Sequence, residues 1–398
     1  MFCLCSIMWI HRKSGSRLGV LKKLLPDTKS DSMRRSLRGW KEALTEVADL
    51  GGMVLQNQAD GHESKFIQEI VKEIGSKLNR MVLGVAPYSI GIDSRVKNIN
   101  LWLQDVSRNV GILVIFGMGG IGKTTIAKTV YNLNFDKFDG SSFLANIREA
   151  SEPLDRLVHL QEQFLSDILK KEKNKIYNVD EGIIKIKDAI RRKRVLLVLD
   201  DVDQLDQLNA LLGMREWFYP GSKIIITTRR KQLLKTSEPY EMHKVKELSD
   251  NESIQLFSWH AFGQDHPIEG YVDLSSKVVN YCRGIPLALQ VLGSSLFGRS
   301  VDVWESALEK LEAIPDSRIV EKLKISFDSL QDDHDKNLFL DIACFFVGED
   351  KDFVITILDQ CYVGTKYGMD NLIDRCLLTI NENNKVTMHQ LLQDMGRE

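Results

Sequence analysis

The sequence predicts an α/β fold built on a doubly wound parallel sheet, followed by a helical domain and a winged-helix domain. Four short apolar runs alternate with helix-like segments in the first part of the chain, as in a buried parallel sheet covered by helices. Helical periodicity takes over beyond about residue 248. A pair of short strand-like segments follows several helices near the end of the chain, a pattern that suggests a winged helix.

The length and composition fit a folded protein of two or three domains. The 398 residues are 43% hydrophobic and 27% charged. The 53 Lys and Arg residues nearly balance the 55 Asp and Glu residues, and the net charge is −2. No overall field therefore draws the molecule to nucleic acid or to an anionic membrane.

The cysteines and the first residues predict a location inside the cell. The six cysteines show no zinc-ligand spacing, so we interpret them as reduced and mostly apolar core residues. No apolar run reaches the roughly 18 residues that span a bilayer. Basic residues follow the apolar run 3–10 rather than precede it, which argues against a secretory signal. We expect a cytoplasmic protein, with nuclear entry left open.

The segments before the sheet are expected to be partly helical. Residues 1–31 show no consistent period, whereas apolar residues at helix spacing predict helices around 37–47 and 66–78. A linker that contains glycine and proline follows at 81–89.

The remaining segments divide the chain into three further domains. Strands are predicted at 112–116, 142–145, 195–199 and 223–228, and the helices between them at 123–132, 157–169 and 181–192. Further helices are predicted at 253–262, 271–282, 286–296 and 303–311, before a hairpin with arms at 376–380 and 385–389. The resulting division begins with an aperiodic segment at 1–31, a helical segment at 32–80 and a linker at 81–89. The α/β domain follows at 90–247, the helical domain at 248–315 and the winged helix at 316–398.

The motif with the most specific chemistry is GMGGIGKTT at 117–125. It matches the P-loop pattern G-x-x-x-x-G-K-[ST] and falls between a predicted strand and a predicted helix, as the motif requires. Its glycines let backbone N–H groups curl around a phosphate, and the helix N-terminus adds positive partial charge. We expect Lys123 to reach the β- and γ-phosphates and Thr124 to bind Mg²⁺. The predicted nucleotide-binding residues of this loop are Gly117, Gly119, Gly120, Ile121, Gly122, Lys123, Thr124 and Thr125.

An acidic pair follows the third predicted strand. Asp200 and Asp201 come after the apolar run 195–199, at the carboxyl edge of the sheet, where ligands bind in such folds. We expect Asp200 to hold Mg²⁺ and Asp201 to orient an attacking water, with Lys123 completing the catalytic set. Two aspartates after a strand are often only the start of a loop, so this interpretation depends on the P-loop.

The fourth predicted strand ends in two arginines. Arg229 would sense a γ-phosphate through a charge-assisted hydrogen bond. From the residues alone, a solvated arginine at the end of a strand is an equally good interpretation. The basic run 191–194 fits a solvated helix end better than a nucleic-acid patch.

Together, these motifs resemble the NB-ARC module of plant TIR-type nucleotide-binding, leucine-rich-repeat resistance proteins, a P-loop NTPase fold of the STAND/AAA type. The resemblance runs from about residue 32 to residue 398. In chain order, the matching segments are WKEAL at 40–44, IGIDSR at 90–95, FLANIR at 143–148, GIPLAL at 284–289 and FLDIACF at 339–345. By pattern alone, the fourth segment is a helix start with proline in its first turn and the fifth is buried core.

The resemblance implies a role for each domain and for several residues. Residues 32–80 would be the last helices of a TIR domain, and the helical and winged-helix domains would be ARC1 and ARC2. Adenine would contact Ile90 and Ile92, Pro286 would pack on the nucleotide beside Leu287, and His389 would touch the β-phosphate of ADP. The implied ligands are ADP or ATP with Mg²⁺.

Two features depart from the family pattern. Gln390 stands where the family's Met-His-Asp motif has its carboxylate, which predicts a weaker hold on ADP. Only the end of a TIR domain is recognised, so the family's NAD-cleaving glutamate is missing, and no leucine-rich array precedes Glu398. We therefore expect a truncated product, a partial gene model or an excised segment that neither cleaves NAD nor recognises an effector directly.

The sequence thus predicts a molecular switch in plant defence signalling. ADP would hold a closed state, ATP would favour an open one, and slow hydrolysis would reset the switch. The resemblance also implies self-association on activation and contacts with other immune-signalling proteins. The alternatives are a turnover ATPase, a non-functional fragment, and a DNA-binding regulator; the last is disfavoured by 13 acidic against 6 basic residues in 331–398.

Overall fold

The computed structural model describes residues 82–398, apart from 106–108, 152–155, 171–174 and 235–239. The chain divides into two units, Met1–Met81 and Val82–Glu398, and the second unit is described here. The segment 1–31 and the two helices predicted within 32–80 lie outside the described residues.

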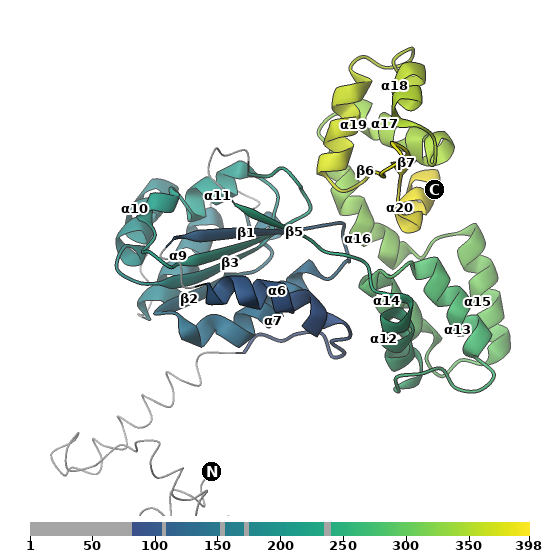
Figure 1. Ribbon diagram of the computed structural model, residues 1–398, viewed down its shortest axis with the longest axis horizontal. Helices are drawn as coiled ribbons and strands as arrows, with labels where there is room; N and C mark the ends of the chain where they lie inside the picture. Colours follow the sequence, from purple (N-terminus) through teal and green to yellow (C-terminus); the bar gives the residue numbers. More distant parts are fainter. Residues whose placement is uncertain (1–81, 106–108, 152–155, 171–174, 235–239) are drawn as a thin grey trace, which may run out of the picture. The chain divides into compact units, whose positions relative to one another are not determined.

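A five-stranded parallel sheet forms the first part of the described chain, which confirms the predicted α/β fold (Figure 1). Its strand order is β2-β3-β4-β1-β5. The strands are β1 (Gly111–Phe116), β2 (Gly140–Leu144), β3 (Val195–Val202), β4 (Lys223–Thr228) and β5 (Glu241–Lys244). The strand β5 was not predicted, because its Glu-Met-His-Lys sequence has no apolar run. It lies at the edge of the sheet and pairs only with β1.

Alternate residues of the strands face two different cores. In β1, Leu113 and Ile115 pack with α6 and α7, whereas Val114 and Phe116 pack with α9, α10 and α11. Figure 1 shows these two groups of helices on opposite sides of the sheet. The helices of this part are α6 (Ile92–Gln104), α7 (Lys123–Asn134), η1 (Phe135–Lys137), α8 (Ile147–Ala150), α9 (Arg156–Leu169), α10 (Val179–Ile190), α11 (Leu205–Leu211) and η2 (Arg215–Trp217). Burial on both faces explains why β1, β3 and β4 contain continuous apolar runs.

Four helices follow the sheet: α12 (Asp250–Phe262), α13 (Val272–Cys282), α14 (Pro286–Leu296) and α15 (Val301–Ala313). Trp304 is fully buried at their centre, and its ring packs against Phe257, Phe262 and Tyr271. Its indole Nε1 donates a hydrogen bond to the Leu296 carbonyl at 3.1 Å. This aromatic cluster stabilises the helices against one another, since each buried aromatic removes a large apolar surface from water.

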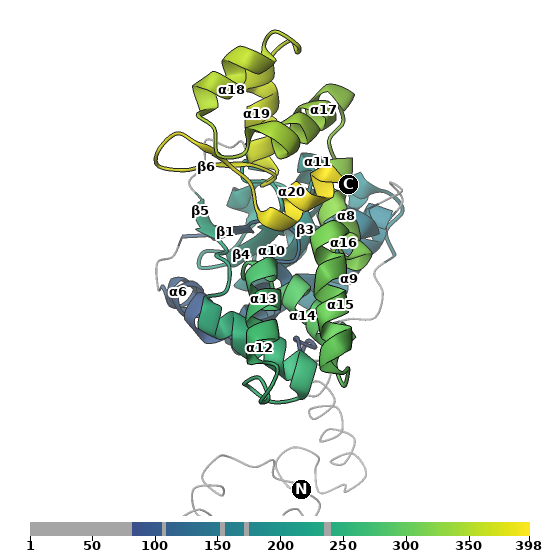
Figure 2. The same ribbon diagram turned by 90° about the vertical axis from the view of Figure 1, so that its right-hand side faces the viewer.

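The last part has helices around a small hairpin, as expected for a winged helix. It comprises α16 (Ser317–Asp328), α17 (Asp333–Asp341), the π-helical η3 (Ile342–Phe346), α18 (Lys351–Leu358), α19 (Thr365–Asp374), β6 (Thr379–Ile380), β7 (Val386–Thr387) and α20 (Gln390–Arg397). The two antiparallel strands are shorter than predicted. The helix α20 packs beside α16 (Figure 2). In the part of the chain that the structure describes, no helix has the length and apolar character needed to cross a membrane.

One aspartate joins the winged helix to the loop that follows β4. The Asp374 carboxylate accepts a hydrogen bond from Arg230 Nε at 3.1 Å and another from the Gln232 amide at 2.5 Å. The Asp374 carbonyl also accepts from the Lys231 amide, at 2.6 Å. The carboxylate is only 12% exposed, so these bonds are poorly screened by water.

We expect Asp374→Ala to lower the free energy of unfolding by about 2 kcal/mol, because it leaves a charged group and a backbone donor without their acceptor. Urea denaturation measures this change. The control is Asp370→Ala on the same helix, where the carboxylate is 61% exposed and meets Lys351 only at 3.9 Å. Equal destabilisation by the two variants would contradict the prediction.

Candidate nucleotide-binding site

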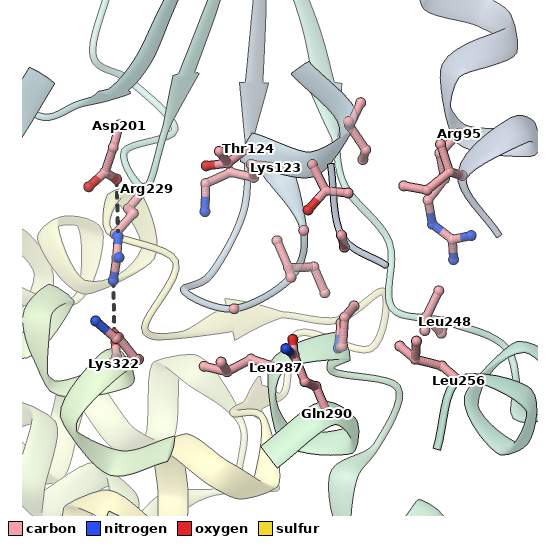
Figure 3. Close-up of a pocket in the computed structure, with 18 of the residues that line it drawn as sticks. Arg95, Lys123, Thr124, Asp201, Arg229, Leu248, Leu256, Leu287, Gln290 and Lys322 are labelled. Carbon is pink, nitrogen blue, oxygen red and sulfur yellow. Dashed lines mark hydrogen bonds and ion pairs between the residues drawn. The ribbon is translucent and has the colours of Figure 1, made fainter. Parts of the chain in front are cut away.

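A cavity of about 410 Å³ lies where the P-loop, α14 and α16 meet. Its two ends differ in chemistry: Asp201 and Arg229 lie at one end, and Leu248 and Leu256 at the other (Figure 3). The predicted site residues that line it are Ile90, Ile92, Gly120, Ile121, Gly122, Lys123, Thr124, Thr125, Asp201, Arg229, Pro286 and Leu287. The others, Gly117, Gly119, Asp200 and His389, do not line it.

The P-loop has the backbone of an anion cradle. Gly120 and Gly122 adopt left-handed conformations, with φ of 77° and 97°, which favour glycine. A Cβ on Gly120 would lie 2.8 Å from Leu287 Cβ, and the Leu287 amide donates to the Gly120 carbonyl at 3.2 Å. Gly122 caps α7 without a side-chain acceptor, so the first N–H groups of this helix remain available to a phosphate.

The Lys123 side chain folds back into the loop. Its ammonium donates to the carbonyls of Gly117 and Met118, both at 2.8 Å. Burial, together with the charge of Arg229, lowers the pKa of Lys123 to about 8. A phosphate would supply the negative charge that this buried ammonium lacks.

The structure brings together the two residues predicted to bind metal. Thr124 Oγ1 donates to Asp200 Oδ1 at 2.9 Å, and Thr227 Oγ1 donates to the same oxygen at 2.7 Å. Asp200 is fully buried at the end of β3, and this burial raises the pKa of its carboxyl group. The end of β3 therefore lies directly beside the start of α7.

Asp201 makes different contacts from Asp200, and the strand is irregular at this point. The β3–β4 register shifts between Leu199 and Val202, and Asp201 has a left-handed φ of 56°. Its carboxylate accepts from Arg148 Nε at 3.0 Å and from Arg229 Nε at 3.3 Å. Burial alone would raise the pKa of Asp201, but the neighbouring cations, led by Arg229, lower it. Both carboxylate oxygens are thus paired with arginines.

Arg229 is not a solvated residue at the end of a strand. Its side chain is only 17% exposed and lines the cavity. Its Nη1 donates to the Lys322 carbonyl at 3.0 Å and lies 3.4 Å from Ser326 Oγ, both on α16 (Figure 3). The arginine predicted to sense a phosphate therefore also holds the first helix of the winged-helix part.

The apolar end of the cavity is tied to the helical part. Arg95 Nη1 donates to the Gly91 carbonyl at 2.7 Å and to Glu252 Oε1 at 2.9 Å. Tyr88, which also lines the cavity, stacks on Trp259 with ring centroids 5.0 Å apart. These contacts fix the segment that carries Ile90 and Ile92 against α12.

His389 lies apart from the other predicted site residues. Its Nδ1 accepts from the Leu391 amide at 3.2 Å, so Nε2 carries the proton and donates to the Arg283 carbonyl at 3.2 Å. Burial lowers the pKa of this imidazole. Gln390 donates to Asp394 Oδ1 at 2.8 Å. In this arrangement the ring caps α20, and the contact of His389 with a phosphate stays a prediction.

Several residues that line the cavity were not predicted. Arg148 and Asn146 follow β2, at the same sheet edge as Asp201, and the parallel topology is the signal that could have indicated them. Lys322 and His260 lie on helices distant in sequence, and no local pattern marks them.

A glycine-rich loop before a helix, an acidic strand end and a lined cavity define a P-loop nucleotide-binding module. Comparisons with known proteins agree. The model of the NB-ARC domain matches residues 92–266, that of the disease resistance protein Roq1-like winged-helix domain matches 332–398, and that of the TIR domain matches 8–85. By these matches the chain resembles the TIR-NB-ARC disease-resistance proteins.

Three curated relatives match nearly the whole chain. Disease resistance proteins RPV1 and RUN1 of Vitis rotundifolia are 47% and 44% identical over 90% and 92% of this chain. TMV resistance protein N of Nicotiana glutinosa is 40% identical over 93% of it. The chain spans only 25%, 27% and 32% of these relatives. A Walker-type ATPase of Pyrococcus abyssi superposes over 80% of this chain and 100% of its own, with a TM-score of 0.48 and 14% identity, too loosely to support an argument.

The lowered pKa of Lys123 predicts that nucleotide binding depends on pH. A bound phosphate favours the ammonium form and raises this pKa above the value of about 8 in the free site. Between the two pKa values binding takes up a proton, so affinity falls as pH rises. We expect the Kd of a nucleoside diphosphate to weaken by up to about tenfold per unit above roughly pH 8.

Titration calorimetry between about pH 7 and pH 9.5 measures this profile. Lys128→Gln is the control, because Lys128 lies on the same helix and does not line the cavity. The control should keep the wild-type profile. A wild-type Kd that stays constant across this range would contradict the prediction.

Proposed function

We propose that this chain is an ADP- and ATP-binding switch that works in defence signalling. The observation that carries the proposal is a single cavity lined by three parts of the chain: Lys123 of the P-loop, Leu287 of α14 and Lys322 of α16. A ligand that fills such a cavity changes how firmly the three parts are held together. The disease-resistance relatives supply the defence role.

The chemistry of the cavity favours an adenine nucleotide with Mg²⁺. The P-loop would hold the phosphates, and the apolar residues around Leu248 and Leu256 would receive the base. The Thr124 hydroxyl and the Asp200 carboxylate are oxygen donors of the kind that Mg²⁺ prefers, alongside waters and phosphate oxygens. Bound Mg²⁺ would neutralise part of the phosphate charge.

A third phosphate would act on the contacts of Arg229. This arginine now donates to the Lys322 carbonyl of α16, and a γ-phosphate would compete for the same guanidinium. ADP leaves this contact in place, whereas ATP weakens it. The two ligands thus differ in affinity for the closed and open states, which is the condition for a switch. A return to the closed form would follow slow hydrolysis.

The arrangement supports slow hydrolysis rather than fast turnover. Asp201, the predicted water-orienting residue, is paired with Arg148 and Arg229. Its lowered pKa makes it a weak base. A turnover ATPase needs a group free to position the attacking water. Self-association on activation, other signalling partners and a cytoplasmic location complete the proposal.

The first test identifies the nucleotide that the purified chain carries. We expect denaturation and chromatography to release nearly one ADP per wild-type chain and none from Lys123→Ala, which loses the buried ammonium. Lys128→Ala, on the same helix, is the control and should keep its ADP. Release of ATP would place the resting protein in the open state. A folded wild type without nucleotide would contradict the proposal.

A second test addresses Gln390. Because the resemblance implies that a carboxylate here helps to hold the closed form, Gln390→Asp should release ADP several-fold more slowly than the wild type. Chase of a fluorescent ADP analogue with excess ADP gives the rate. Gln390→Asn is the control, because it has the size of Asp without the charge, and it should not slow release. An Asp variant that releases ADP as fast as the wild type would argue against this role.

A further inference from the structure

Arg148 lies at the polar end of the cavity, where no role was assigned to it from the sequence. It belongs to α8, just after β2, and its side chain is only 16% exposed. Its Nε donates to Asp201 Oδ2 at 3.0 Å, and its Nη2 donates to Glu149 Oε1 at 3.0 Å. In the part of the chain that the structure describes, Nη1 has no hydrogen-bond partner. The guanidinium thus keeps a donor edge free beside the cavity.

The strand order places Arg148 beyond Arg229 along the sheet edge. The P-loop follows β1, Arg229 follows β4, Asp201 ends β3 and Arg148 follows β2, in the spatial order β1, β4, β3, β2. The bond from Thr124 Oγ1 to Asp200 Oδ1, 2.9 Å long, brings the end of β3 beside the P-loop. The outermost phosphate of a nucleotide held by the P-loop would therefore lie nearest to Asp201 and its two arginines. The third phosphate of ATP would extend further toward them than the second phosphate of ADP.

The charges at this end also favour an additional anionic group. Lys123, Arg148 and Arg229 all interact with the single carboxylate of Asp201. Glu149, the second acidic partner of Arg148, is 61% exposed and contributes little to neutralising the cluster. Three cationic side chains thus share one carboxylate at this end of the cavity before a ligand binds.

We propose that Arg148 is a second arginine for the γ-phosphate, held by Asp201 until ATP binds, and that it sets the preference of the site for ATP over ADP. This inference rests on the proposed function. A guanidinium suits the role because its planar set of donors can bind a phosphate with two N–H groups. On ATP binding, Nη1 and Nη2 would turn to the γ-phosphate, and Asp201 would keep Arg229 or release both arginines.

A purely structural role for Arg148 makes a different prediction. If the arginine only kept Asp201 in its left-handed conformation, its loss would loosen the site for both nucleotides alike. A γ-phosphate contact affects only the triphosphate. The ratio of the two affinities therefore separates the two roles.

The test measures the Kd values of ADP and of a non-hydrolysable ATP analogue for the whole chain by calorimetry, after bound nucleotide is removed. We expect Arg148→Gln to raise the Kd of the analogue roughly tenfold or more and the Kd of ADP by less than about threefold. Arg148→Lys, which keeps the charge but not the planar donors, should recover part of the loss. The control is Arg318→Gln, which breaks an ion pair with Asp316 outside the cavity and should change neither Kd.

The proposal would be overturned if Arg148→Gln lost affinity equally for both nucleotides, or lost affinity for neither. If Arg148→Gln fails to fold, Arg148→Lys decides the question. A loss of affinity confined to the ATP analogue then supports the proposal. Unchanged affinities, or equal losses of affinity for the analogue and ADP, overturn it. A wild type that binds neither nucleotide refutes the proposed function itself. A wild type that binds both, with an unchanged ratio in the variants, refutes only the role of Arg148.

Discussion

The pairing of the Asp201 carboxylate with Arg148 and Arg229 is the interaction on which the polar end of the cavity depends. A non-glycine residue in a left-handed conformation costs about 1 kcal/mol, and Asp201 has this conformation at the irregular end of β3. Two partly buried ion pairs offset that cost. They also fix α8, through Arg148, and α16, through Arg229. Without the carboxylate, the two arginines and Lys123 would repel one another in a poorly solvated space.

The parallel sheet explains why these groups meet and how the site reaches the winged helix. All of its strands end at one edge, so segments far apart in sequence deliver side chains to one place. The loop after β4 then makes two adjacent connections. Arg229 bonds to Lys322 on α16, and its neighbour Arg230 bonds to Asp374 on α19. In the proposed switch, a movement of Arg229 toward a ligand would act on a segment that is bonded to the winged helix one residue later.

Local patterns were enough to predict the fold and the P-loop, and they failed where long-range packing decides the outcome. Continuous apolar runs identify the strands because both faces of the sheet are buried. The strand β5 was missed because it is short, polar and at the edge. The contact of Arg229 with Lys322 joins segments 93 residues apart, and no periodicity encodes it. For His389, the expectation came from resemblance and stays a prediction, and its hydrogen bond to the Arg283 carbonyl joins segments 106 residues apart.

The same ion pairs explain why the site suits a switch better than a rapid enzyme. In this structure the charged groups of the site already have partners within the protein. Lys123 donates to loop carbonyls, and the two arginines form ion pairs with Asp201. An incoming phosphate must replace these partners, so part of its binding energy goes into rearranging the protein. In the proposed switch, a triphosphate would disturb more of these pairs than a diphosphate, and one of the residues disturbed would be Arg229, which also holds α16. The proposed difference in affinity between closed and open states would therefore follow from where the charges already lie.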